Sequence, residues 1–96
     1  MCNVVLDGVK INSECDFHRE ISCLLDFGPY YGDNLDALWD RLSTDVERPV
    51  TIIWLHSELS RHALGAYFDQ IIDIFERTRQ QDIKFNWNEK FDYVLN

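Results

Sequence analysis

The sequence has few residues that interrupt regular structure and no long apolar run. Its 96 residues include four glycines and two prolines, and no segment is repetitive or of low complexity. The longest apolar runs, such as residues 52–55, are far shorter than the roughly 20 residues that span a bilayer. The glycines form no phosphate-cradling loop. These absences exclude a membrane span, a repeat protein and a nucleotide-binding loop, and they predict a single domain over residues 1–96.

Basic residues are also scarce. Nine Lys and Arg residues stand against 17 Asp and Glu residues, which gives a formal net charge of −8. Affinity for nucleic acid comes from Lys and Arg, so the chain is not expected to bind nucleic acid. An acidic domain can attract a basic partner, but acidity alone also fits a domain whose charge only keeps it soluble. The placement of the charges is therefore more informative than their number.

The cysteines do not form a disulfide pattern. Cys2, Cys15 and Cys23 are odd in number and include no C-x-x-C pair, which does not suit a secreted, disulfide-held domain. The N-terminus has neither the basic nor the apolar segment of a secretory signal. We therefore expect reduced thiols in a cytoplasmic protein. Cys15 and Cys23 share one expected helix, where we expect them to be packing residues.

Patterns that support catalysis or metal binding are missing as well. His18, His56 and His62 show no metal-ligand spacing, and Cys15 with His18 supplies only two ligands. The sequence contains no G-x-S-x-G turn and no motif around a Cys–His nucleophile. We therefore expect no enzymatic activity, no bound metal and no other cofactor.

Hydrophobic periodicity predicts strands that alternate with helices, which is an α/β domain with a mainly parallel sheet. Residues 50–55 are apolar on both faces, as in a strand that is covered on both sides. The expected elements are a strand over 1–6, a helix from a cap at Asn12 or Ser13 to Gly28 and Pro29, a helix over 33–43, a strand over 50–55, a short helix from Ser57 to Leu64 or Gly65, a helix with an apolar stripe at Phe68, Ile71, Ile72 and Phe75, and a strand over 83–87. Residues 91–95 either add a short strand or cover an edge, so residues 87–96 are treated as a C-terminal extension.

The second expected helix gathers its acidic residues on one side. At 100° per residue, the wheel separates an apolar arc from an acidic ridge, with Leu35, Leu38, Trp39 and Leu42 on the arc and Asp33, Asp36, Asp40 and Thr44 on the ridge. Asp33 or Asn34 suits the N-cap, with Asp33 better regarded as a cap than as part of the ridge, and Asp36 suits the first turn. Asp40 has no such local reason and repels Asp36 by about 0.2–0.5 kcal/mol. A solvated polar face would tolerate this repulsion, whereas a cationic partner would relieve it.

Aromatic residues flank the ridge. Aromatics beside charges are typical of protein–protein contacts, because they desolvate a large area with little loss of side-chain entropy. Trp39 lies at the edge of the apolar arc, where packing explains it equally well. Tyr30 and Tyr31 are adjacent in a loop, so they cannot both belong to the core.

Residues 30–40, YYGDNLDALWD, resemble the barstar family of intracellular inhibitors of barnase-type ribonucleases. The resemblance runs from about residue 3 to residue 87 and is also carried by Val46, Glu47, Pro49, Trp54, Ile74, Phe75, Asp82 and Ile83. It places Asp82 and Ile83 at the entry of the last strand. It implies a three-stranded parallel sheet packed with about four helices.

The resemblance also implies a mechanism in which the second helix and its preceding loop enter the active site of the ribonuclease. Asp40 would be the central plug, Asp36 its neighbour, and Tyr30 a contact to the catalytic histidine. The complex would be one-to-one and of the immunity or antitoxin type, formed by a protein that is monomeric when free. The expected partner-binding residues are Tyr30, Tyr31, Asn34, Asp36, Trp39, Asp40, Ser43, Thr44, Asp45 and Arg77.

Two places depart from the family pattern. Thr44 and Asp45 stand where the family has Gly-Trp, and Arg77 stands where the fourth helix has an acidic contact residue. Glu76 lies one place earlier, and a shift of one residue turns a side chain by about 100°. The acidic plug is kept while its rim differs, which predicts a related but different nuclease.

Two other functions remain open at this point. The acidic helix could neutralise another basic protein, such as a DNase toxin or a nucleic-acid-binding protein. A hydrolase built on Asp36 and Asp40 is disfavoured, because one helical turn holds them about 6 Å apart on a convex surface instead of in a cleft.

Overall fold

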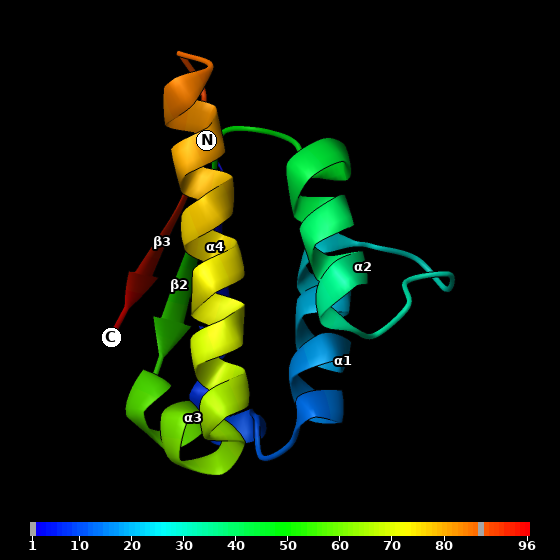
Figure 1. Ribbon diagram of the computed structural model, residues 1–96. Helices are drawn as coiled ribbons and strands as arrows, with labels where there is room; N and C mark the ends of the chain where they lie inside the picture. The colour runs from blue at the N-terminus through cyan, green and yellow to red at the C-terminus, as the bar shows by residue number, and fades with distance from the viewer. Residues whose placement is uncertain (1, 87) are drawn as a thin grey trace.

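A three-stranded parallel sheet underlies the fold in the computed structural model, which describes residues 2–86 and 88–96 (Figure 1). Strands β1 (Cys2–Asp7), β2 (Val50–Leu55) and β3 (Phe91–Leu95) lie in the order β1-β2-β3. Trp54 pairs with Leu6 on one side, and Val50 pairs with Phe91 on the other. Parallel strands need crossover connections, which the helices supply. The predicted α/β class and three-stranded parallel sheet are confirmed.

Four α-helices accompany the sheet in the described part of the chain: α1 (Glu14–Leu25), α2 (Leu35–Asp40), α3 (Ser57–Leu64) and the long α4 (Ala66–Lys84). A short 3-10 turn, η1 (Gly8–Lys10), follows β1. Ser13 is the N-cap of α1, and its hydroxyl accepts a hydrogen bond from the Asp16 amide at 3.2 Å. The helix ends before Gly28, because Asp26 already adopts a left-handed conformation with φ 55°.

The core is built around Trp54 of β2. Its ring stacks on Phe17 of α1 at 5.5 Å and meets Phe68 of α4 at 5.0 Å between ring centroids. The indole N–H donates to the Ser60 hydroxyl at 3.0 Å, so the buried polar atom is satisfied. α1 and α4 are thereby held against the same strand.

The sheet is covered more fully on one face than on the other. Along β2, Val50, Ile52 and Trp54 are buried, whereas the residues between them are only half-buried. Val5 of β1 and Val94 of β3 pair with Ile53 in register and are 47% and 43% exposed. The expectation that β2 would be covered on both sides is therefore wrong.

The expected last strand is also wrong. α4 continues to Lys84, and the third strand lies at Phe91–Leu95. No glycine or proline occurs between Gly65 and the end of the chain, and the buried positions Phe75, Thr78 and Asp82 keep helical spacing, so nothing ends the helix at residue 82. Of the expected strand 83–87, Ile83 and Lys84 belong to α4, and Trp87, like Met1, lies outside the described residues. Of the two expectations for residues 91–95, a short strand or the cover of an edge, the strand is correct, and it completes the sheet.

The cysteines differ from the expectation too. Cys15 and Cys23 are free thiols on the exposed side of α1 and do not pack into the core. The apolar stripe of this helix is formed by Phe17 and Ile21 instead.

A buried ion pair joins α4 to the sheet. The carboxylate of Asp82, which is fully buried, accepts hydrogen bonds from the Arg48 Nε at 2.9 Å and Nη2 at 3.2 Å. It also accepts one from the Phe91 amide at 2.7 Å. Arg48 precedes β2 and Phe91 opens β3, so one carboxylate connects α4 with two strands.

Replacing this carboxylate should destabilise the fold. We expect Asp82→Ala to lower the free energy of unfolding by about 3–5 kcal/mol, because it removes one partner of a buried ion pair and the acceptor for the Phe91 amide. Urea unfolding would measure the loss. Glu89→Ala, an exposed acid in the connection between α4 and β3, is the control and should change stability by about 0.5 kcal/mol or less. Equal stability of the two variants would contradict the role of Asp82.

Candidate functional site

α2 presents the predicted acidic ridge from an anchored position. Leu38 and Leu42 on its inner side are fully buried. On the outer side, Asp36 and Asp40 are exposed, and in residues 2–86 and 88–96 neither carboxylate has a hydrogen bond or an ion pair. The inner side therefore positions two carboxylates that no neighbouring residue neutralises.

The cap that begins α2 is Asn34. Its side-chain oxygen accepts from the Ala37 amide at 2.8 Å, and its side-chain nitrogen donates to the Gly32 carbonyl at 3.2 Å. Asp33 adopts a left-handed conformation with φ 54°, whereas an N-cap needs the extended backbone that Asn34 has. The cap that orients the helix is therefore Asn34, and the interpretation of Asp33 as the cap is wrong.

The helix widens after Asp40 into a π-type turn, η2 (Arg41–Asp45). The hydroxyls of Ser43 and Thr44 both donate to the Asp40 carbonyl, at 3.2 and 2.6 Å. Asp45 accepts from Arg41 at 3.1 Å, so this acid is already paired. The expected helix over 33–43 is thus shorter at its start and continues as a wider turn, and Ser43 and Thr44 support the Asp40 carbonyl.

Trp39 and Arg77 meet between α2 and α4. The Arg77 guanidinium lies 4.6 Å from the centroid of the Trp39 ring, within the range of a cation–π contact. Trp39 is half-buried against the core, and Arg77 is exposed. Two expected contact residues, far apart in the sequence, therefore form one feature at the edge of the ridge.

The two adjacent tyrosines have opposite environments. Tyr30 is 91% exposed beside α2, as a contact residue would be. Tyr31 is only 7% exposed and packs on Phe27 at 4.8 Å between ring centroids. Burial raises the pKa of the Tyr31 hydroxyl well above its usual value of 10. The Tyr31 side chain therefore holds the loop to the core, and its contact with a partner stays a prediction.

Tyr31 is held by a buried histidine. His18 of α1 is 1% exposed, and its Nδ1 lies 2.7 Å from the Tyr31 hydroxyl. Its Nε2 lies 2.6 Å from the Tyr67 hydroxyl on α4. Burial lowers the pKa of His18 below 6.5, against smaller opposing effects of Asp33 and Glu14. The loop before α2 is thus fastened to α1 and α4 through one neutral imidazole.

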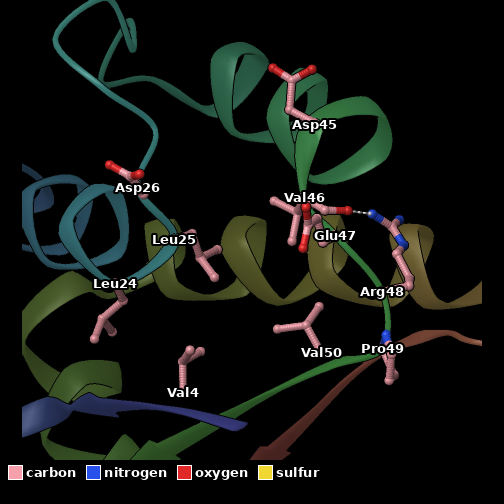
Figure 2. A pocket seen from close by; sticks show the side chains of 10 residues that line it. All are labelled: Val4, Leu24, Leu25, Asp26, Asp45, Val46, Glu47, Arg48, Pro49 and Val50. Atoms are coloured by element: carbon pink, nitrogen blue, oxygen red, sulfur yellow. Dashed lines mark hydrogen bonds between the residues drawn. The ribbon is translucent and has the colours of Figure 1, made fainter. Parts of the chain in front are cut away.

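A cavity of about 520 Å³ lies beside η2 (Figure 2). Val4, Leu25 and Val50 form its apolar side, and the carboxylate of Asp45 points away from them. Arg48 is directed toward the Val46 carbonyl, to which it donates at 2.6 Å. The cavity shares only Asp45 with the expected site, so it is separate from the acidic ridge.

Two further features are absent from the described ranges, a metal-binding cluster and a membrane-spanning helix. No group of three or more His, Cys, Asp and Glu side chains in them could hold a metal ion. None of the helices there combines the length and the apolar character needed to cross a membrane.

Sequence reasoning missed several residues around α2. His18 and Tyr67 gave no signal, because they meet Tyr31 only through tertiary packing. Asp69 and Asp73 of α4 face α2 across a groove that also includes Asp36. The spacing of these two acids, one helical turn apart like Asp36 and Asp40, is the signal that could have found them.

The geometry defines a small parallel α/β domain whose exposed helix carries unpaired carboxylates on a convex face. The sequence model of the family Barstar (barnase inhibitor) matches residues 1–94. The chain belongs to this family. It is also similar to the protein named "Putative ribonuclease inhibitor YrdF" of Bacillus subtilis (strain 168), with 33% identity over 81 aligned residues. The aligned residues make up 84% of this chain and 89% of that protein.

Acid should weaken the fold through His18. Because burial lowers the folded-state pKa of His18, the unfolded chain binds the proton more tightly. The contribution of neutral His18 to the free energy of unfolding is therefore complete above pH 6.5, and it is lost as the pH falls through the folded-state pKa. The pKa values of Asp16 and Glu76 are lowered from 3.8 and 4.5, so the contributions of these groups change at more acidic pH.

The test is urea unfolding at several pH values between 7.5 and 5, on the parent and on His18→Gln. We expect the parent to lose stability toward pH 5 and the variant to lose clearly less. Parallel pH profiles for the two proteins would show that His18 does not cause the effect.

Proposed function

We propose that this chain inhibits a cytotoxic ribonuclease by placing the carboxylates of α2 in its basic active site. The observation that carries the proposal is the pair of exposed, unpaired carboxylates of Asp36 and Asp40 on a helix anchored by Leu38 and Leu42. A ribonuclease active site must bind phosphate and therefore presents cationic groups. Carboxylates can occupy the same positions through charge-assisted hydrogen bonds.

Family membership supports this partner. The family is described as barnase inhibitors, and the Bacillus subtilis relative carries the name of a ribonuclease inhibitor. These names indicate an inhibitor and not an enzyme. We propose a one-to-one complex of the immunity or antitoxin type, formed in the cytoplasm by a protein that is monomeric when free.

The repulsion between Asp36 and Asp40 also supports a cationic partner. Like charges one turn apart cost a helix about 0.2–0.5 kcal/mol, and within the described part of the chain no cation forms an ion pair with either carboxylate. A basic partner would remove the repulsion on binding. The net charge of −8 would also speed association with a basic partner, an effect for which the barnase complex of this same family is a worked example.

The rim of the ridge favours a nuclease that differs from barnase. Arg77 lies on Trp39, and Asp45 is paired with Arg41. A partner shaped for an acid at position 77 would meet a guanidinium there instead. The second candidate function, neutralisation of another basic protein such as a DNase, keeps the same ridge and changes only the target.

Inhibition assays separate these functions. The purified chain would be titrated against barnase, other barnase-type ribonucleases and basic DNases, with cleavage of RNA or DNA as the readout. We expect stoichiometric inhibition of at least one ribonuclease. Inhibition of DNases alone would support the second candidate, and inhibition of no ribonuclease would contradict the proposal.

Removing the central carboxylate should weaken inhibition without weakening the fold. We expect Asp40→Ala to raise the inhibition constant about 30-fold or more, since truncating an interface hot spot costs about 2 kcal/mol or more of binding free energy. The barnase complex of this family is itself one of the examples behind that magnitude. The melting temperature should stay equal or rise, because a repulsion is removed. Glu89→Ala, outside α2 and its loop, is the matched control. If Asp40→Ala inhibits as strongly as this control, Asp40 is not the plug.

A further inference from the structure

We propose that the cavity between α1 and the loop before α2 is a modification site, in which Cys15 or Cys23 forms a mixed disulfide with a small thiol. The incoming thiol carries both a carboxylate and an ammonium group. Arg19 binds the carboxylate, and Asp33 binds the ammonium group. No residue of α2 lines this cavity, so the site does not depend on the proposed function.

The cavity has a volume of about 490 Å³ and two walls. One wall is a single face of α1, with helical spacing between its four lining residues: Cys15, Arg19, Ser22 and Cys23. The other wall is the loop, which contributes Gly28, Pro29, Tyr31 and Asp33. The Tyr31 hydroxyl lies 2.7 Å from the Nδ1 of His18 on α1, so the loop is fastened to the helix that it faces. Both thiols therefore lie in a hollow of fixed shape.

Both thiols are free and accessible. Cys15 and Cys23 are exposed, although free cysteine is among the residue types that are most often buried. Packing therefore does not explain two cysteines on this face of α1. Exchange with a disulfide requires an accessible thiol, which both positions provide.

The two thiols react separately. Cys15 and Cys23 are eight residues apart on α1, which corresponds to about 12 Å along the helix. The Cα atoms of a disulfide are at most about 7 Å apart, and two sulfur ligands of one zinc ion each lie about 2.3 Å from the metal. The thiols can thus neither bond to each other nor share a metal ion. A disulfide in this cavity needs a sulfur atom from a second molecule.

The reaction is a thiol–disulfide exchange, and the oxidant is a disulfide of low molecular weight. The protein thiol loses its proton, and its sulfur attacks one sulfur of the small disulfide. The bond between the two small-molecule sulfurs breaks as the new sulfur–sulfur bond forms. The second half leaves as a thiolate and takes up a proton. One protein thiol is oxidised, and one half of the small disulfide is reduced.

The charges of the lining identify the incoming thiol. Arg19 lies one helical turn after Cys15 and one turn before Cys23, so it is near either adduct. Its side chain is 66% exposed, and its Nη2 donates to Asp16 at 2.6 Å. A guanidinium has five N–H donors, so Arg19 can also donate to a carboxylate in the cavity.

The opposite wall supplies the opposite charge. Asp33 is exposed, and its carboxylate forms no hydrogen bond or ion pair within residues 2–86 and 88–96. A cation on one wall and an anion on the other fit a ligand that carries both charges. Cysteine itself has this chemistry, and its disulfide, cystine, is the probe.

The test compares adduct formation from cystine with adduct formation from cystamine, which has ammonium groups but no carboxylate. The full chain is equilibrated with each disulfide and its thiol, and peptide mass spectrometry measures the modified fraction at each cysteine. The ratio of the two equilibrium constants cancels the intrinsic reactivity of each thiol. The control thiol is Gln80→Cys, at an exposed position of α4, in a chain that also carries Cys15→Ser and Cys23→Ser.

We expect the ratio of cystine to cystamine at Cys15 or Cys23 to exceed the control ratio about threefold or more, as one exposed ion pair would give. Arg19→Gln should lower this ratio to the control value, and Arg19→Lys, which keeps the charge, should retain most of it. Asp33→Asn should lower the preference for cystine over dithiodipropionate, which has carboxylates but no ammonium group. Asparagine tolerates the left-handed backbone of position 33, so this variant should fold.

Two results would overturn the site. One is an equal ratio at the cavity thiols and at the control thiol, which would show that the cavity does not select the adduct. The other is an unchanged ratio in Arg19→Gln, which would show that the guanidinium does not bind the carboxylate. Thermal unfolding of each variant checks that a lost preference does not reflect a lost fold.

Discussion

The carboxylate of Asp82 is the constraint on which the rest of the structure depends. It accepts hydrogen bonds from Arg48, just before β2, and from the amide of Phe91, the first residue of β3. Three segments far apart in the sequence therefore converge on one buried charge. Such a charge is tolerated only where its partners are all present, so the end of α4 and the starts of two strands are placed together.

α2 depends on this frame through its inner face. The core holds Leu38 and Leu42, and the loop before α2 is held by Tyr31 against His18. The outer face has no such role, since the carboxylates of Asp36 and Asp40 form no hydrogen bond or ion pair with the described part of the chain. Packing and the proposed recognition are thus assigned to different sides of the same short helix.

Much of this arrangement could be predicted from the sequence. Helical periodicity placed Leu38 and Leu42 inward and Asp36 and Asp40 outward, because this pattern is local and repeats every turn. The last strand could not be placed in the same way. The alternation at residues 83–86 imitates a strand, whereas α4 runs to Lys84 because Asp82 is buried with helical spacing.

The environments of single side chains were also beyond the sequence. Tyr30 and Tyr31 are chemically identical, and the second one is buried because it packs on Phe27 and bonds to His18, which is distant in the sequence. The groove acids Asp69 and Asp73 repeat the spacing of Asp36 and Asp40, but their proximity to Asp36 results from the packing of α2 on α4 and could not be read from the sequence. Long-range packing, which periodicity does not report, decides these positions.

The separation of the two faces of α2 has an evolutionary consequence. Under the proposed function, a substitution on the outer face changes which nuclease the protein recognises and leaves the buried contacts of Leu38 and Leu42 intact. A gene that encodes this domain can therefore follow a changing nuclease by single exposed replacements, each of which yields a folded protein. The proposed recognition surface can thus be replaced while the frame stays unchanged, and the same property would make α2 a practical scaffold for laboratory selection of new inhibitors.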